Sequence, residues 1–98
     1  MTVRVLKTAR ADLADGYWFY ETQAPGLGAY FVRQIHEDLE RLGHIAGIHR
    51  KTHDGLHKMI ARRFPYAIYY RIEGDTVGVN AILVGRRAPT WIRKRLGQ

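Results

Sequence analysis

The chain has 98 residues, of which 46% are hydrophobic, and it contains no cysteine. That length suits a single domain, 1–98, with one modest core, and the lack of cysteine excludes disulfides and thiolate metal sites. No segment approaches the roughly 18 apolar residues of a membrane span, and the N-terminus lacks the apolar stretch of a signal peptide, so a cytoplasmic protein is expected.

The formal net charge of +7 is concentrated in the second half of the sequence. Residues 50–98 contain 11 Lys or Arg against three acidic residues, a balance of +8. Residues 1–49 contain five basic residues against six acidic ones, a balance of −1. Because a one-sided positive field attracts polyanions and acidic protein segments, the second half is predicted to carry a binding surface.

The first elements in the chain are a strand and a helix. Val3 and Val5 alternate with polar neighbours, which predicts a short strand. Thr8 is placed to act as the N-cap of a following helix, with Asp12 and Asp15 near the positive end of that helix. The apolar positions of this helix recur at helical spacing and are Leu13, Tyr17, Tyr20 and Ala24.

A Pro-Gly pair at 25–26 ends the first helix and separates it from a second. The second helix is predicted from Leu27 to about Ile45, because its apolar residues follow a helical period. Its apolar stripe consists of Leu27, Phe31, Ile35, Leu39, Leu42 and Ala46. The residues predicted to face solvent are Arg33, Glu37, Asp38, Glu40 and Arg41. Two amphipathic helices joined by so short a break form an antiparallel hairpin.

The second half predicts a polar loop, 47–55, followed by three antiparallel strands. The strands are expected at 56–64, at 66–73 with Ile68, Tyr70 and Ile72 on one face, and at 77–83 with Val77, Val79, Ala81 and Leu83 turned into the core. Gly74-Asp75 suits the hairpin turn between the last two strands, because glycine tolerates a positive φ. Residues 91–96 predict a short basic helix. The whole is an α+β domain in which a helical hairpin covers one face of an antiparallel sheet.

Motifs along almost the whole chain share a pattern with one known group of proteins. In the predicted helical hairpin these motifs are Ala11-Asp12-Leu13, Trp18-Phe19-Tyr20-Glu21, Pro25-Gly26-Leu27-Gly28 and Phe31. In the predicted strands they are Arg62-Arg63-Phe64-Pro65-Tyr66-Ala67-Ile68-Tyr69-Tyr70-Arg71, Gly85-Arg86-Arg87 and Trp91. Together they resemble the RelE/ParE superfamily of toxins.

The resemblance implies a β-α-α-β-β-β fold and the function of a type II toxin–antitoxin toxin. Such a toxin is neutralised by a cognate antitoxin in a heteromeric complex. No cofactor, no metal and no membrane partner are expected. RelE-like members enter the ribosome and cut mRNA. ParE-like members poison DNA gyrase and are not nucleases themselves.

The RelE-like nuclease pattern is only partly present. Metal-free RNA cleavage needs groups that move protons and stabilise the phosphorane charge, and clustered basic residues supply them. Lys58 matches the first basic position of the pattern, and Arg87 matches the arginine after the third meander strand. Ile60 stands where a second lysine is expected, Ala67 stands where an arginine is expected, and no tyrosine lies beyond Tyr70.

The incomplete set of nuclease residues favours the ParE-like branch, whose members are non-enzymatic toxins that bind and poison gyrase. The residues expected to contact its target are Lys58, Arg62, Arg86, Arg87, Trp91 and Arg93. The alternative is a ribosome-dependent mRNA interferase, a metal-independent endoribonuclease, with the catalytic residues Lys58, Arg63 and Arg87. The antitoxin is expected to cross the helical hairpin and the basic sheet surface, where an acidic chain gains most.

Some of these basic residues also have plainer interpretations. If 56–64 is a strand throughout, Arg62 and Arg63 point to opposite faces and only one of them serves a site. Trp91 either anchors a partner or packs the C-terminal segment onto the sheet. The run Arg93-Lys94-Arg95 is more typical of a solvated helix end than of a nucleic-acid reader.

The histidines of the 47–57 region offer two further hypotheses. His49, His53 and His57 are four residues apart, a spacing that aligns metal ligands on a helix. Gly47 and Gly55 argue against a helix there, so a metal site is not expected. His57, beside a lysine, is a candidate general base because its ordinary pKa suits that role.

Overall fold

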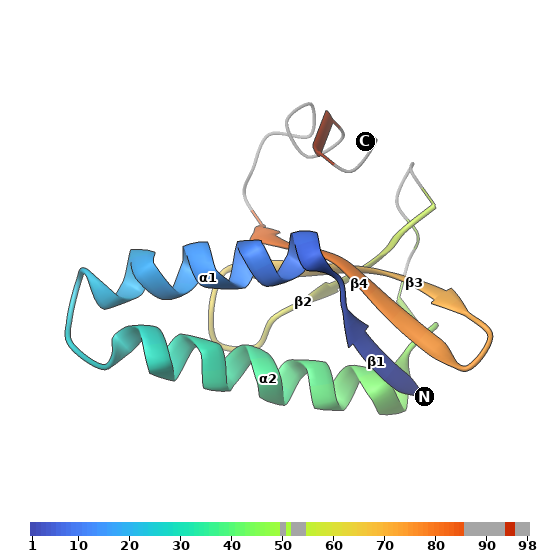
Figure 1. The fold of residues 1–98 in the computed structure, drawn as a ribbon. Helices are drawn as coiled ribbons and strands as arrows, with labels where there is room; N and C mark the ends of the chain where they lie inside the picture. The colour runs from blue at the N-terminus through green and yellow to red at the C-terminus, as the bar shows by residue number, and fades with distance from the viewer. Residues whose placement is uncertain (50, 52–54, 86–93, 96–98) are drawn as a thin grey trace.

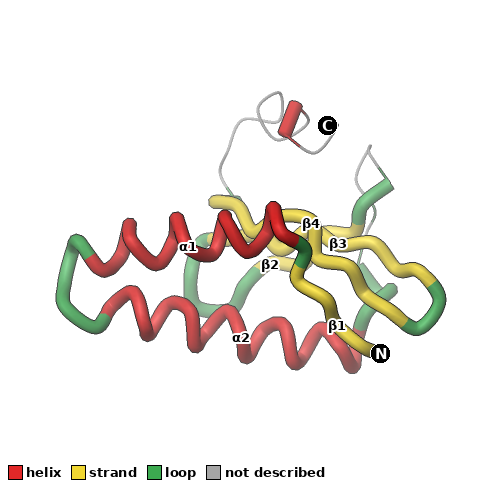
Figure 2. The backbone as a smooth tube through the Cα atoms, viewed as in Figure 1, coloured by secondary structure: helices red, strands yellow, loops and turns green. Residues whose placement is uncertain are grey.

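The computed structural model describes residues 1–49, 51, 55–85 and 94–95 (Figure 1). Its elements are β1 (Thr2–Val5), α1 (Lys7–Glu21), α2 (Leu27–Ile45), β2 (His57–Ile60), β3 (Tyr66–Glu73) and β4 (Thr76–Val84). The two helices run antiparallel and lie along one face of the sheet (Figure 2). The predicted order of elements and the α+β class are confirmed. Neither helix is long and apolar enough to cross a membrane in this described part of the chain.

The sheet has the strand order β1-β4-β3-β2. β3 is antiparallel to both β2 and β4, which confirms the predicted meander. β1 runs parallel to β4, with Val3 opposite Val77. The helical hairpin connects β1 to β2 at the opposite edge of the sheet, and the meander then brings β4 back beside β1. The turn at Gly74-Asp75 also forms as predicted, with φ of 61° at Gly74.

The second helix has the predicted bounds, and four residues of its stripe are buried in the main core: Phe31, Ile35, Leu39 and Leu42. Asp38 is the exception to the predicted polar face, because it is only 3% exposed. The helix starts against the carboxylate of Glu21, which accepts the N–H groups of Gly26 and Gly28 at 2.9–3.1 Å. A carboxylate there neutralises unpaired N–H groups at the positive end of the helix.

The first helix begins differently from the prediction. Its N-cap is Leu6, without a side-chain cap, so the expected Thr8 cap is wrong. The Thr8 hydroxyl instead donates to the carbonyl of Asn80 at 2.8 Å and fastens α1 to β4. Ala24 was expected in the buried stripe, but α1 ends at Glu21 and Ala24 is exposed.

The two helices approach closely at two glycines, one on each helix. A Cβ atom on Gly16 would lie 2.5 Å from Cε2 of Phe31, and one on Gly28 would lie 2.6 Å from the carbonyl oxygen of Tyr17. Phe31 in turn packs against Phe64 and Tyr66, with ring centroids 5.0 and 4.9 Å away. Glycine at position 16 therefore makes room for the aromatic centre of the core.

A β-bulge interrupts the last strand. Tyr69 lies opposite Ala81 and Tyr70 lies opposite Val79, which leaves Asn80 as an extra residue. In β4, the side chains of the helix-facing cluster are Val77, Val79 and Ile82, and those of the opposite cluster are Ala81 and Leu83. The expectation that Val77, Val79, Ala81 and Leu83 share one face is wrong, because the bulge reverses the alternation.

The first meander strand is shorter than predicted. β2 ends at Ile60, and the Ala61 N–H donates to the carbonyl of Tyr66 at 2.9 Å, which closes a tight connection. Residues 62–65 form that connection. Arg62 and Arg63 are therefore loop residues, and the expectation that they alternate across a strand is wrong.

Candidate functional site

The sheet face opposite α1 and α2 is here called the open face because neither helix covers it. Its central residues Ala67, Tyr69, Ala81 and Leu83 are buried, and the half-buried Lys58 lies on its edge strand β2. The strand partner of Lys58 is Tyr69, and the Lys58 Nζ lies 5.9 Å from the centre of the Tyr69 ring. Tyr69 is 1% exposed, and burial raises the pKa of its phenol. The ring therefore stays neutral and acts as a fixed platform beneath the ammonium group, an arrangement of cation–π type. The predictions that Tyr70 lies in the core and Tyr69 on the opposite face are confirmed.

Two neighbouring positions on the open face lack the expected charge. Ile60 follows Lys58 by two residues along β2, and its side chain is 58% exposed. Ala67 lies opposite Ile60 on β3 and is fully buried. Arg71 follows Tyr69 by two residues, and Arg4 lies between Val3 and Val5, which pack on the helix side, so both arginines lie on the same face as Lys58.

Arg62 and Arg63 lie elsewhere, in the β2–β3 connection beside α2. They line a polar hollow of about 210 Å³, here called the arginine hollow, whose lining residues are Gln34, Glu37, Asp38, Arg41, Arg62 and Arg63. Lys58 does not line it. Of the described candidates for a nuclease, Lys58 and Arg63, the structure therefore places one on the open face and the other in the arginine hollow.

The buried carboxylate of Asp38 connects the two elements that line the arginine hollow. Its Oδ1 lies 3.1 Å from Nη2 of Arg41, and its Oδ2 accepts the backbone N–H of Arg62 at 3.4 Å. The carboxylate thus links α2 to the connection that carries the two exposed arginines. A buried carboxylate needs such partners, because an unpaired buried charge is strongly destabilising.

Two histidines, His49 and His57, contact Tyr70. Nδ1 of His49 lies 2.6 Å from the Tyr70 hydroxyl, which also accepts the Gly47 N–H at 3.1 Å. The His57 ring stacks on Tyr70 with centroids 5.0 Å apart, and its Nδ1 donates to the His49 carbonyl at 2.8 Å. Burial lowers the pKa of His49, and the nearby charges of Arg41 and His57 lower it further.

The positions of His49 and His57 test the two hypotheses of a metal site and of His57 as a general base beside Lys58. His57 packs on Tyr70, on the helix side of the sheet, whereas Lys58 packs on Tyr69 on the open face, so the two side chains do not meet. Within the residues that the structure describes, no group of three histidine, aspartate or glutamate side chains is placed to hold a metal. His53 lies outside the described residues.

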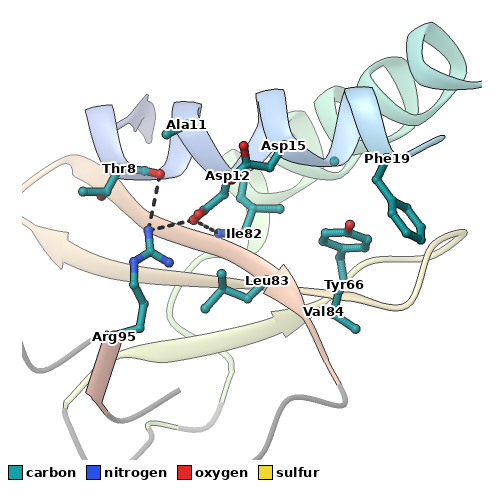
Figure 3. Close-up of a pocket in the computed structure, with 11 residues that line it drawn as sticks. Thr8, Ala11, Asp12, Asp15, Phe19, Tyr66, Ile82, Leu83, Val84 and Arg95 are labelled. Carbon is teal, nitrogen blue, oxygen red and sulfur yellow. Dashed lines mark hydrogen bonds and ion pairs between the residues drawn. The ribbon is translucent and has the colours of Figure 1, made fainter. Parts of the chain in front are cut away.

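A second hollow, of about 600 Å³, lies between α1 and the end of β4. Its walls are largely apolar, with Phe19, Tyr66, Leu83 and Val84 among them (Figure 3). Arg95 closes one side of this hollow by an ion pair with Asp12.

The Asp12 ion pair joins distant parts of the chain. Nη2 of Arg95 lies 2.9 Å from Oδ2 of Asp12 and donates to the Thr8 carbonyl at 3.4 Å, as Figure 3 shows. The same carboxylate oxygen accepts the Ile82 N–H at 3.0 Å. Burial raises the pKa of Asp12 and outweighs the opposing effects of Ile82 and Arg95. Arg95 is therefore a tethered residue and not part of a freely solvated helix end.

The remaining candidates, Arg86, Arg87, Trp91 and Arg93, lie outside the described residues. The basic helix predicted at 91–96 is described only at Lys94 and Arg95, which are helical. Sequence reasoning missed Asp12, Asp38 and Arg41 as organising residues. Asp38 could have been found, because it lies three residues after Ile35 and four before Leu42, within the apolar stripe.

Comparison with known proteins gives one informative result. No protein-family model and no curated protein matches the sequence, but seven chains of solved structures match the fold. One of them comes from a structure described as the chromosomal ParDE TA system from P. aeruginosa. It matches with a TM-score of 0.78 and 24% sequence identity, over 86% of this chain and 95% of that chain.

This chain shares its fold with a chain of a ParDE TA system. The β-α-α-β-β-β fold that the resemblance implied is thereby confirmed. Within this fold, the open face belongs to the meander, the arginine hollow lies between α2 and the β2–β3 connection, and the Asp12 ion pair ties Arg95 to α1.

Proposed function

We propose that this chain is the toxin of a type II toxin–antitoxin module. It acts in the cytoplasm by binding and poisoning DNA gyrase, and a cognate antitoxin holds it inactive in a heteromeric complex. The observation that carries the proposal is the fold shared with a chain of a ParDE TA system over nearly the full length of both chains. The positive balance of residues 50–98 supports it, because an acidic segment of a partner is attracted to that half.

The side chains of the open face favour binding over RNA cleavage. Ile60 is apolar and exposed, and Ala67 is buried, at the two positions where the nuclease pattern expects basic groups. Lys58 and Arg63 line different surfaces, whereas a phosphoryl-transfer site needs its groups around one phosphate. Among the residues that the structure describes, this basic surface has no converging set of proton-transfer groups, which suits a toxin that acts by binding its target.

Controlled expression of the chain tests the proposal. Growth should stop when the chain is expressed alone, and co-expression of a short protein encoded beside it should restore growth. Continued growth at high levels of folded protein contradicts the toxin function. Primer extension on translated mRNA from the arrested cells then separates the mechanisms, because cuts at specific sites support the mRNA interferase and uncut mRNA supports the gyrase poison.

A further inference from the structure

Three arginines from two separate elements converge on the arginine hollow. Arg41 comes from α2, and Arg62 and Arg63 come from the β2–β3 connection. Like charges at such proximity repel, so their convergence requires a compensating group. Asp38 supplies part of that compensation, because its buried carboxylate pairs with Arg41 and accepts the Arg62 N–H.

Positive charge remains in the hollow after this pairing. Within the described part of the chain, no hydrogen bond or ion pair engages the guanidinium groups of Arg62 and Arg63, and both residues are exposed. Arg41 uses one of its terminal nitrogens on Asp38, and a guanidinium has five donor hydrogens in all. Three arginines face two carboxylates, Glu37 and Asp38, so the lining is one negative charge short of balance.

We infer that the arginine hollow is a binding site for one carboxylate of an acidic side chain on a partner protein. A single carboxylate balances the charges of the lining. Its two oxygens fit the planar fork of a guanidinium, which makes the bidentate pair that arginine favours. A volume of about 210 Å³ is large enough for an acidic side chain.

A nucleic-acid backbone fits the hollow less well. Neighbouring phosphates carry a charge each, and Glu37 and Asp38 are part of the same lining. A second phosphate of the strand would therefore meet a carboxylate close to the first. An isolated acidic side chain places only one negative charge among the arginines. Gln34, also in the lining, adds an amide that can hydrogen-bond to the peptide beside that side chain.

Asp38 acts here as a positioning residue. Its two oxygens hold Arg41 and the backbone of Arg62 at fixed points, so that the hollow exists before a ligand arrives. Ordering flexible arginine side chains on binding costs free energy, and prior organisation reduces this cost. The inference uses only side chains of this chain and does not depend on gyrase being the target.

Nuclear magnetic resonance of the arginine Nε–Hε groups tests the inference directly. The probes are a blocked peptide of alternating glutamate and alanine, the same peptide with glutamine in place of glutamate, inorganic phosphate, and a single-stranded oligonucleotide. At low salt, the glutamate peptide should shift the signals of Arg41, Arg62 and Arg63, and the glutamine peptide should leave them unchanged. Arg63→Gln should raise the Kd of the glutamate peptide about tenfold, a change typical of one lost charge-assisted contact.

Arg33→Gln is the matched control, because Arg33 is an exposed arginine of α2 outside the hollow. It should leave the Kd of the glutamate peptide unchanged. The inference is overturned if Arg33→Gln weakens binding as much as Arg63→Gln does, since binding then follows overall charge. It is also overturned if only phosphate or the oligonucleotide shifts the three arginines, or if no probe does.

Discussion

Asp38 shows how position can outweigh residue type. A charged residue within the apolar stripe of α2 is buried because Arg41 and the Arg62 N–H satisfy its oxygens. Sequence reasoning placed Asp38 in solvent because it weighed the charge and not the position. The partner from the β2–β3 connection lies 24 residues further on, and no local pattern shows such a contact.

We expect Asp38→Ala to lower the free energy of unfolding by about 1–3 kcal/mol, since it leaves the Arg62 N–H and the Arg41 guanidinium without their partner. Glu37→Ala is the control, because Glu37 is the exposed neighbouring carboxylate. It should change the free energy by less than about 0.5 kcal/mol. Denaturant unfolding of both variants measures the difference, and equal effects would show that Asp38 has no special role.

His49 should make stability depend on pH. The pKa of His49 in the folded chain lies below its ordinary value of 6.5, so the unfolded chain binds a proton more readily. The free energy of unfolding should therefore fall as the pH drops below about 6.5. His49→Gln should reduce this loss between pH 7.5 and 5.5, whereas His44→Gln, at an exposed position of α2, should retain it. Identical pH profiles for wild type and His49→Gln would contradict this account.

A substitution of Lys58 tests whether the open face contributes to gyrase inhibition. Lys58→Gln removes an ammonium held over Tyr69, and we expect it to weaken gyrase inhibition by about 1 kcal/mol, or about fivefold. Lys7→Gln removes the same charge from the exposed start of α1 and should have little effect. Dose–response curves for gyrase inhibition compare the two. If both variants lose equally, the effect comes from net charge and not from the open face.

At the scale of elements, the sequence predicted correctly those elements whose apolar residues recur with a strong and regular period. The bounds of α2 follow from a long apolar stripe with helical spacing, and the structure has the same bounds. The parallel pairing of β1 with β4 was not predicted, because it joins residues more than 70 positions apart. The bulge at Asn80 was missed because Ala81 to Val84 are all apolar, so alternation carries no information there.

The close packing of α1 on α2 gives a prediction at this scale. Gly16→Ala should gain about 1 kcal/mol of helix propensity, yet its Cβ would overlap the ring of Phe31. We expect a net loss of about 1–3 kcal/mol, because Phe31 is fixed among other aromatic rings. Thermal or denaturant unfolding measures this change.

The double variant Gly16→Ala, Phe31→Leu separates this packing effect from a general effect on the helix. Leucine is shorter than phenylalanine and frees the space that the new Cβ needs. The double variant should therefore be more stable than the sum of the two single changes predicts, which is a favourable coupling between the sites. Additive changes would show that the approach of Gly16 to Phe31 does not limit stability.

At the scale of the whole molecule, the sequence predicted the fold better than the arrangement of the site. The predicted order of elements and the predicted meander agree with the structure, and the fold is shared with a chain of a ParDE TA system. The described basic candidates do not form one patch, however, since β2 ends at Ile60 and places Arg62 and Arg63 beside α2. Because the strand ends four residues earlier than predicted, Lys58 lies on a different surface from Arg62 and Arg63.

The separation of charge along the chain predicts how a partner binds. If the basic second half attracts an acidic protein surface, association should slow as salt screens that field, over a Debye length of about 8–10 Å near physiological ionic strength. The rate of association with the co-encoded antitoxin should fall markedly between 50 and 300 mM salt, roughly in line with screening of several charges. A rate that is independent of salt would contradict the proposed role of this half.

The most direct test of the central proposal is a supercoiling assay with purified DNA gyrase. We expect the chain, added at about the concentration of gyrase, to abolish supercoiling and to leave cleaved DNA bound to the enzyme. Addition of the antitoxin should restore supercoiling. Undiminished supercoiling at several times the gyrase concentration, by a chain that stops growth when expressed, would contradict the account.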